Sequence, residues 1–439
     1  MGNVDIKKVI DGSKMNSFHF KLLFVFILLA MFDGYDMFYL GNIIPSLIRE
    51  WQITPETAGM ITSSGLFGMV IGALFLGMMA DKLGRRQTIV AATVLFSLFT
   101  LIASFSMNAI FFSVCRFIAG LGLGGILPVL NASLGEVLPK DKRISVVTLV
   151  NIGVPIGSVL TSLVAMFIIP QLGWRAMLWV GALPILFVPL ILKVVPNSPE
   201  YSYRQGRFED LAQLLNRITN QTTYNAQTYT YIFRKDEKGE QKNKLFDLFV
   251  NHRALTTLIF WTASFMNLVA LYGLSTWLPQ MMVNAGYSLT SSISFLLILN
   301  IGSIAGAIVG GGLADWFRVK YVIVLYFATC FAVLMFLGFK PVALITYALL
   351  FIAGATTSGT QMLINSYIAS FYPSHIKSTG TGWGIGIGRI GGICGPLIGG
   401  LILGLGTLPY IYNFVVFAIP CLIAAIVILF VQEKYSATR

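Results

Sequence analysis

The sequence contains few charged residues, few cysteines and few histidines. Only 11% of its 439 residues are charged and 56% are apolar, whereas soluble proteins contain about 25% charged residues. The mean hydropathy of +0.79 is correspondingly high. This composition excludes an ordinary soluble domain and predicts a chain that lies mostly within a lipid bilayer.

The four cysteines and three histidines also limit the possible chemistry. All four cysteines (Cys115, Cys330, Cys394 and Cys421) lie in apolar stretches without ligand spacing, so they predict neither a disulfide framework nor a metal site. The sequence shows no nucleophile–base pair, phosphate-binding loop or large sensory domain. A multispan enzyme or a receptor is therefore disfavoured, and no cofactor is expected.

Twelve apolar stretches are long enough to cross a bilayer, which takes about 20 residues of α-helix. None of them alternates as the strands of a membrane β-barrel do. The sequence therefore predicts an all-α polytopic membrane protein with twelve transmembrane helices. The predicted spans are residues 20–48, 57–80, 88–107, 109–137, 144–169, 174–194, 254–284, 289–313, 320–338, 341–370, 378–405 and 408–431.

Basic residues are distributed unevenly between the two sides of these spans. If the N-terminus is cytoplasmic, 25 of the 30 lysines and arginines lie on the cytoplasmic side, and only Arg49, Arg175 and Lys340 lie outside. By the positive-inside rule, both termini are predicted to be cytoplasmic. Membrane orientation thus accounts for the net charge of +12, and no nucleic-acid partner is expected.

One long polar segment divides the spans into six and six. The predicted domains are an N-terminal six-helix bundle (1–195), a cytoplasmic central loop (196–253) and a C-terminal six-helix bundle (254–439). In the loop, Ser198-Pro199-Glu200 predicts the start of a short amphipathic helix over 199–218. A flexible stretch is expected to follow, over about 220–243.

The two halves share an internal repeat, which appears when the chain is compared with itself at an offset of 234 residues. Two parallel six-span halves, with a binding site between them near the midplane, are typical of secondary transporters. Glycines in the repeat allow close helix approach in lipid, either for sliding or for static packing. The coinciding pairs include Gly68 and Gly302, Gly72 and Gly306, Asp81 and Asp315, and Gly120 and Gly354.

Two carboxylates lie inside the first span. Asp33 and Asp36 are the only charged residues between Leu22 and Ile48, and an ionisable group at the bilayer centre costs at least about 2.5 kcal/mol. Because they are three residues apart, we expect them on one helical face, where they could bind a proton or a cation. The alternative is a structural ion pair within the bundle.

Two arginines also lie within spans, Arg116 in the fourth and Arg389 in the eleventh. An arginine stays protonated, so neither is expected to carry protons. Arg116 is expected to pair with Asp33 or Asp36. Arg389 lies roughly 18 Å into its span, near mid-bilayer, where its guanidinium could bind a substrate carboxylate or form a structural pair with an aspartate.

Other candidates for substrate binding are polar and aromatic side chains near midspan. Aromatic side chains suit stacking on a ring, although core packing is the alternative for each of them. The candidates are Tyr35, Tyr39, Asn267, Tyr272, Gln361, Asn365 and Trp383.

The loop between the second and third spans reads Gly77-Met-Met-Ala-Asp81-Lys-Leu-Gly84-Arg85-Arg86. It resembles the signature loop of the major facilitator superfamily, and Gly311-Gly-Leu-Ala-Asp315 resembles a weaker second copy. Asp81 is expected to attract Arg85 or Arg143, with Glu136 as a further partner, in a network that latches the cytoplasmic face. The alternative is a solvated turn, in which each exposed pair contributes at most about 1 kcal/mol.

Three further elements narrow the resemblance: Asp33-Gly-Tyr-Asp36, Arg116 with the glycines that follow it, and Arg389 in Gly388-Arg-Ile-Gly-Gly-Ile-Cys-Gly-Pro396. Together they resemble the aromatic acid:proton symporters. That resemblance implies the major facilitator fold, uptake of benzoate, hydroxybenzoates or related acids, and a bacterial inner-membrane location. It also implies functional importance for Asp33, Asp36, Asp81, Arg116, Glu136, Lys377 and Arg389.

The sequence thus predicts a proton-coupled symporter that imports a small aromatic carboxylate by alternating access. Asp33 and Asp36 would take up protons, Arg116 would reset them, and Arg389 would bind the acid. Lys377 is grouped with the loop residues in gating. The expected partners are the acid, protons and the lipid bilayer, and the carrier is expected to be a monomer.

Two alternatives stay open at this point. One is a symporter for another organic acid, such as sialate, nicotinate or muconate, because related symporters carry a similar Asp-Gly-aromatic-Asp element. The other is a proton-driven efflux antiporter. The fifth span reads Gly153-Val-Pro155-Ile-Gly157 instead of the antiporter-type Gly-x-x-x-Gly-Pro pattern, which favours symport.

Overall fold

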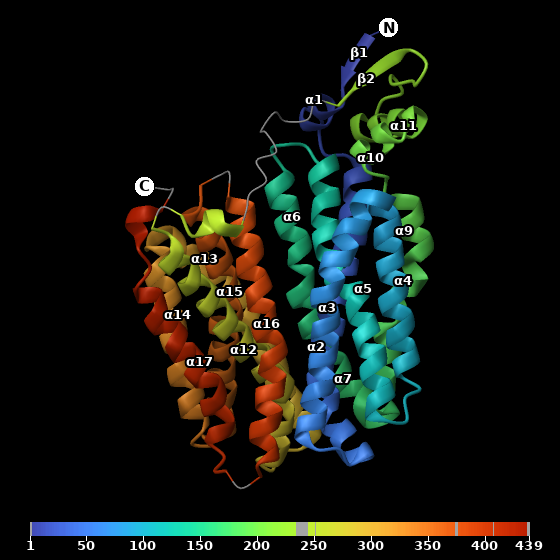
Figure 1. The fold of residues 1–439 in the computed structure, drawn as a ribbon. Helices are drawn as coiled ribbons and strands as arrows, with labels where there is room; N and C mark the ends of the chain where they lie inside the picture. Colours follow the sequence, from blue (N-terminus) through green and yellow to red (C-terminus); the bar gives the residue numbers. More distant parts are fainter. Residues whose placement is uncertain (1, 234–244, 251, 374–375, 407, 437–439) are drawn as a thin grey trace.

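The protein is a bundle of long helices with a small cap at one end (Figure 1). The computed structural model describes residues 2–233, 245–250, 252–373, 376–406 and 408–436. In these residues twelve segments are long and apolar enough to cross a membrane. Each begins and ends within four residues of its predicted span, so the prediction of twelve transmembrane helices is confirmed.

The first six segments form one bundle, called here the first half. Its first four segments are single helices, and its last two are broken. The helices are α2 (Ser17–Trp51), α3 (Pro55–Leu83), α4 (Arg85–Ala103), α5 (Ala109–Val137), α6 (Arg143–Asn151), α7 (Gly153–Leu172), α8 (Arg175–Gly181) and α9 (Val188–Val194), with a 3₁₀ turn η1 (Leu183–Phe187).

Proline explains both breaks. Pro155 has no N–H group to donate to the carbonyl of Asn151, and the fifth segment divides into α6 and α7 at that point. In the sixth segment, Pro184 lies at the start of η1 and Pro189 at the start of α9. The sequence predicted one span in each place; the structure contains two α-helices in each, joined in the sixth segment by η1.

The last six segments form the second half. Each is a single helix, and the set is α12 (Ala254–Asn284), α13 (Leu289–Trp316), α14 (Val319–Leu337), α15 (Ala343–Phe371), α16 (Lys377–Gly404) and α17 (Tyr412–Leu429). Two short 3₁₀ turns flank this half, η2 (Leu245–Leu248) and η3 (Glu433–Tyr435).

Within each half, glycines bring one pair of helices into backbone contact, and the two pairs are equivalent in the repeat. A Cβ atom added at Gly72 of α3 would lie less than 3.0 Å from the carbonyl of Leu121 in α5. At the equivalent position in the repeat, a Cβ at Gly306 of α13 would meet the carbonyl of Ala355 in α15 at less than 3.0 Å. The helix pairs α3/α5 and α13/α15 therefore use the same close packing, which depends on small residues.

Both chain termini lie at one end of the bundle (Figure 1). We call it the terminal end; α3 finishes there and α16 begins there. The other end, where α2 finishes and α3 begins, is called the opposite end.

A small cap covers the first half at the terminal end (Figure 1). Strand β1 (Gly2–Asp5) pairs in parallel with β2 (Tyr229–Ile232), with Gly2 opposite Tyr229. The cap also contains α1 (Ile6–Asp11), α10 (Pro199–Arg204) and α11 (Phe208–Thr219). Its apolar side chains, including Ile6, Ile10, Leu211, Leu215 and Ile218, join the core of the first half.

The cap differs from the sequence prediction in two ways. The single amphipathic helix expected over 199–218 is two helices, separated at Gly206, which has a positive φ of 66°. Strand β2 lies within the stretch expected to be flexible; the part of that stretch from 234 to 243 lies outside the described residues. A strand pair 227 residues apart in sequence has no local signal that would predict it.

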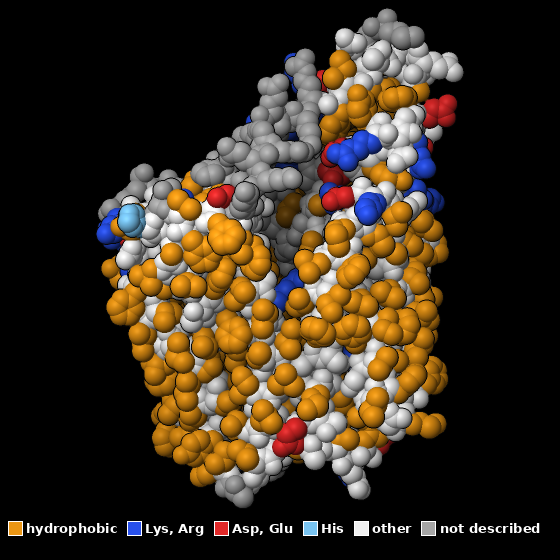
Figure 2. Space-filling view, viewed as in Figure 1, with side chains coloured by type: hydrophobic (Ala, Val, Ile, Leu, Met, Phe, Trp, Pro, Cys, Tyr) orange, Lys and Arg blue, Asp and Glu red, His pale blue; other side chains and the backbone are white. Residues whose placement is uncertain are grey.

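The two halves are in contact from the middle of the bundle to the opposite end. Ser63 of α3 donates a hydrogen bond to the carbonyl of Ile393 in α16 (2.7 Å). The amide of Asn300 in α13 donates to the carbonyl of Ser158 (2.9 Å) and to Oγ of Ser162 (3.2 Å) in α7. At the terminal end, by contrast, Figure 2 shows a hollow between the halves, with Lys or Arg atoms at its base.

Candidate functional site

A buried ion pair connects α2 to α5 in the first half. Nη1 and Nη2 of Arg116 donate to Oδ1 (3.1 Å) and Oδ2 (2.9 Å) of Asp36. Thr100 of α4 donates a third hydrogen bond to Oδ1 (3.1 Å). Asp36 is 0% exposed and Arg116 is 3% exposed, so each charge depends on the other for compensation. Asp33 and Asp36 were both proposed as partners of Arg116, and in the structure Arg116 pairs with Asp36.

Tyr35 and Tyr39 pack around this pair. Their rings are stacked with centroids 6.3 Å apart, and the Arg116 guanidinium lies 5.0 Å from the centre of the Tyr39 ring. The Tyr35 hydroxyl donates to the carbonyl of Met177 (3.0 Å). Both tyrosines were predicted to bind substrate. They instead lie fully buried in the core of the first half, because their face of α2 is turned towards the neighbouring helices of that half.

Asp33 has different surroundings from Asp36. It is 1% exposed, and within the described chain neither of its carboxylate oxygens has a hydrogen-bond partner. The charges that act on it are those of Asp36 and of Arg389 from α16. A spacing of three residues turns about 300° around a helix. That rotation allows Asp36 to form its ion pair within the first half while Asp33 interacts across the halves.

Arg389 is a basic group on the second half that lies within electrostatic range of Asp33 without pairing with it. It is half-buried, and it also acts electrostatically on Tyr272 of α12. Over the residues that the structure describes, Arg389 forms no ion pair within 4.0 Å. Its guanidinium is therefore not committed to a structural aspartate in this arrangement.

Two aromatic rings meet between the halves beside these charges. Phe38 of α2 and Tyr272 of α12 lie nearly parallel, with centroids 6.1 Å apart and planes inclined at 9°. The Tyr272 hydroxyl also contacts Sδ of Met37 at 3.1 Å. Phe38 and Met37 were not among the predicted residues. Met37 lies four residues and Phe38 five residues after Asp33 on α2, and this proximity is the signal that could have identified them.

The predicted amides form a chain within the second half. Nδ2 of Asn267, the repeat counterpart of Asp33, donates to Oε1 of Gln361 (2.9 Å) and to the carbonyl of Thr357 (3.2 Å). Gln361 in turn donates to Oδ1 of Asn365 (3.1 Å). Trp383 is 42% exposed and packs on Trp261, with ring centroids 5.9 Å apart. The structure thus brings the three amides together, whereas Trp383 contacts Trp261 and not these amides in the bonds described.

The signature loop forms an ion-pair cluster at the terminal end of the first half. Arg85 donates through Nε to Oε1 of Glu136 (3.0 Å) and lies 3.6 Å from Asp81, whose side chain is 71% exposed. Arg143, also proposed as a partner of Asp81, pairs with Asp11 of α1 at 2.7 Å. The sequence did not indicate that α1 docks there. Gly77, which begins the signature loop, is not required there for close packing, because a Cβ at this position would meet no atom within 4 Å.

The second copy of the loop forms no equivalent cluster. Asp315 is exposed, and Val319 occupies the position equivalent to Arg85, so the helix offers it no basic partner four residues on. Arg318 lies 3.8 Å from Glu433 instead. Lys377 is exposed at the start of α16. None of the ion pairs seen among the described residues joins the two halves.

The described part of the chain contains no group of three or more His, Cys, Asp or Glu residues that could hold a metal ion. The charged and aromatic groups that meet between the halves near the middle of the bundle are Asp33, Arg389 and the rings of Phe38 and Tyr272. This set combines an unpaired carboxylate, an unpaired guanidinium and two flat apolar surfaces.

The chain resembles transport proteins in sequence and in fold. The model of the Major Facilitator Superfamily matches residues 26–393. A benzoate transport protein of Acinetobacter baylyi is 35% identical over 436 residues, covering 98% of this chain and 93% of that protein. A gentisate transporter of Corynebacterium glutamicum is 33% identical over 422 residues, covering 93% and 87%. The crystal structure of a D-xylose–proton symporter has the same fold, with a TM-score of 0.76, 16% identity and coverage of 96% and 100%.

Proposed function

The chain belongs to the Major Facilitator Superfamily and its aromatic acid transporter group, and on this premise we propose that it imports a small aromatic carboxylate together with protons. It is a multi-pass membrane protein and a transporter, not an enzyme, since its family and relatives are transport proteins. The proposed location is the bacterial cytoplasmic membrane, and the proposed working unit is a monomer.

The observation that carries the proposal is that the unpaired charges of Asp33 and Arg389 lie beside an aromatic pair, Phe38 and Tyr272, between the halves. Arg389 has no ion-pair partner among the described residues and can donate two parallel hydrogen bonds to a carboxylate. Phe38 and Tyr272 offer parallel ring faces beside it, which suit an aromatic substrate. Asn267, Gln361 and Asn365 are the proposed polar contacts for ring substituents.

Proton coupling is assigned to Asp33, with Asp36 and Arg116 as its fixed neighbours. A buried carboxylate without hydrogen bonds or an ion-pair partner is costly in its charged form, so the surroundings seen here favour the protonated form of Asp33. Asp36 already has three hydrogen bonds, including both from Arg116, and is compensated without a proton. Asp33 is therefore the better candidate for reversible protonation.

The proposed conformation is open to the cytoplasm. The cytoplasmic assignment of the terminal end rests on the excess of basic residues on that side. The hollow at this end and the contacts made by Ser63 and Asn300 towards the opposite end then correspond to an inward-open state. The Asp81–Arg85–Glu136 cluster, with Arg86 and Arg143, is proposed to latch the cytoplasmic side when the halves close there.

Uptake into proteoliposomes tests this function directly. With an imposed inward proton gradient, the purified protein is expected to accumulate radiolabelled benzoate or a hydroxybenzoate above equilibrium, and a proton ionophore is expected to abolish accumulation. Competition by hydroxycinnamates, nicotinate, muconate and sialate identifies the preferred acid. If no monoaromatic acid is transported or competes, the substrate class is wrong; if proton entry drives export of the acid, the carrier is an antiporter.

Arg389→Gln is expected to raise the KM for the acid by roughly 30-fold or more, because loss of one member of a buried charge pair costs about 2–5 kcal/mol. Arg389→Lys retains the charge but not the planar fork, so an intermediate KM is expected. Arg49→Gln, at an exposed position near the opposite end, is the matched control and should leave KM unchanged. A normal KM in Arg389→Gln would assign this arginine a structural role.

A further inference from the structure

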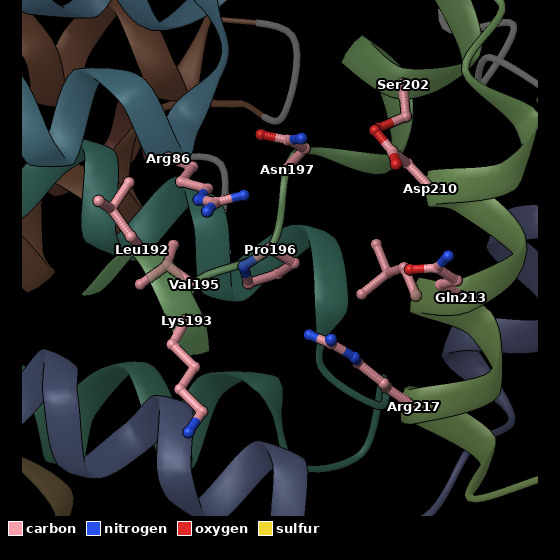
Figure 3. A pocket seen from close by; sticks show the side chains of 11 residues that line it. Arg86, Leu192, Lys193, Val195, Pro196, Asn197, Ser202, Asp210, Gln213 and Arg217 are labelled. Carbon is pink, nitrogen blue, oxygen red and sulfur yellow. The ribbon is translucent and has the colours of Figure 1, made fainter. Parts of the chain in front are cut away.

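Two adjoining cavities lie on the first half at the terminal end, away from the space between the halves. One has a volume of about 300 Å³ and the other about 360 Å³, and Lys193 and Arg217 line both. Arg86 also lines the first cavity and Lys21 the second. Figure 3 shows Arg86, Lys193 and Arg217 arranged around the first cavity on three separate segments of the chain.

The cavities are strongly basic. Four basic side chains and one acidic side chain, Asp210, contribute to their walls. In the portion of the chain that the structure describes, none of the four basic groups forms an ion pair. Convergent cations without carboxylate partners attract anions, and guanidinium and ammonium groups are the usual ligands of phosphate.

The walls of the cavities are held in place by the fold. Helix α11 is fixed by burial of Leu211, Leu214, Leu215 and Ile218. Nδ2 of Asn16, the N-cap residue of α2, donates to the carbonyls of Arg217 and Ile218, each at 2.9 Å. The end of α11 is thereby anchored at the beginning of α2, which brings Arg217 and Lys21 to the same cavity.

The cavities also lie where the lipid-facing surface ends. On α2, Phe20 and Phe24 flank Lys21 and are 60% and 64% exposed. On α9, Leu192 precedes Lys193 and is 43% exposed. Exposed apolar side chains on spanning helices face acyl chains, and basic residues directly beyond them lie at headgroup level.

We propose that these two cavities bind the phosphate headgroup of an anionic phospholipid, such as phosphatidylglycerol or cardiolipin. The phosphate contacts Lys193 and Arg217, with Arg86 and Lys21 on either side, and the acyl chains lie along Phe20, Phe24 and Leu192. Because the site joins α11 to α2 and α9, a bound lipid stabilises the docking of the cap on the first half. The proposal does not depend on the transported substrate.

The test compares lipids added to the delipidated full-length protein in detergent. Phosphatidylglycerol and cardiolipin are expected to raise the thermal unfolding midpoint, and phosphatidylcholine is not. The double variant Lys193→Gln with Arg217→Gln is expected to weaken phosphatidylglycerol binding, measured by native mass spectrometry, by about 30-fold. That factor corresponds to about 2 kcal/mol for two basic residues.

The matched control is Lys82→Gln with Lys140→Gln, which removes the same charge from exposed positions on the same side and lines neither cavity. It should bind phosphatidylglycerol as the unmodified protein does. Equal loss of binding in the control would show a general charge effect and overturn the proposal, as would full binding by the double variant. An equal stabilisation by inorganic phosphate would also overturn it, because the site would then hold a soluble anion.

Discussion

Arg116→Gln is expected to lower the free energy of unfolding by about 3–5 kcal/mol, the usual cost of breaking a buried ion pair by removing one partner. The variant leaves Asp36 fully buried with only the hydrogen bond from Thr100, and it also removes the cation above the Tyr39 ring. The expected result is a large fall in the thermal midpoint of the purified protein in detergent, together with loss of transport.

The control for this prediction is an ion pair of the same half that is exposed instead of buried. Arg175 and Glu50 are 2.6 Å apart, and their side chains are 35% and 42% exposed. An exposed pair contributes about 0–1 kcal/mol, so Arg175→Gln should shift the midpoint little. If both variants shifted it equally, burial would not be the reason for the importance of Arg116.

The double variant Asp36→Asn with Arg116→Gln separates stability from transport. Replacing both charges with amides removes the uncompensated carboxylate, and stability should return towards that of the unmodified protein. Transport should stay impaired if the pair affects Asp33 during the cycle. A double variant that is stable and transports normally would show that the pair is only structural.

The sequence predicted the membrane helices accurately because long apolar runs are a strong local signal. It also predicted the repeat, and the recurring contacts of Gly72 and Gly306 follow the repeat spacing. The β1–β2 pair and the docking of α1 were not predictable in this way. They depend on contacts between segments distant in sequence, and the short segments have no strong periodicity.

The candidate site was predictable in part for a similar reason. Charged residues in apolar spans stand out, so Asp33, Asp36, Arg116 and Arg389 were identified from the sequence. On a helix that is apolar all round, however, the sequence does not show which face meets which neighbour. Tyr35 and Tyr39 were therefore assigned to the substrate although they pack in the first half, and Phe38 was missed although it meets Tyr272.

The two halves are chemically unequal although they repeat in architecture. Asp33 and Asp36 correspond to Asn267 and Ala270 in the second half, and Arg389 corresponds to Pro155 in the first. The free carboxylate thus lies on one half and the free guanidinium on the other. A proton on Asp33 and an acid anion on Arg389 would neutralise both, and that is a requirement for closing a low-dielectric site around them.

Asp33→Asn is accordingly expected to abolish proton-driven accumulation while it retains exchange of acid across the membrane. An asparagine mimics the protonated carboxyl, so the halves can close with substrate bound, but no proton is released. In proteoliposomes, one proton per monoanion allows about tenfold accumulation for each unit of pH gradient, and the variant should reach a ratio of about one. Counterflow of labelled acid against unlabelled acid should persist.

Asp141→Asn, at an exposed loop position on the terminal side, is the matched carboxylate control and should accumulate the acid normally. Full accumulation by Asp33→Asn would transfer the proton-carrying role to Asp36 or to another group. Loss of both accumulation and counterflow would instead place Asp33 in substrate binding or folding, and the thermal midpoint would distinguish these two. Only the combination of lost accumulation, retained counterflow and an unchanged midpoint supports Asp33 as the proton carrier, because a purely structural aspartate cannot affect the one process without the other.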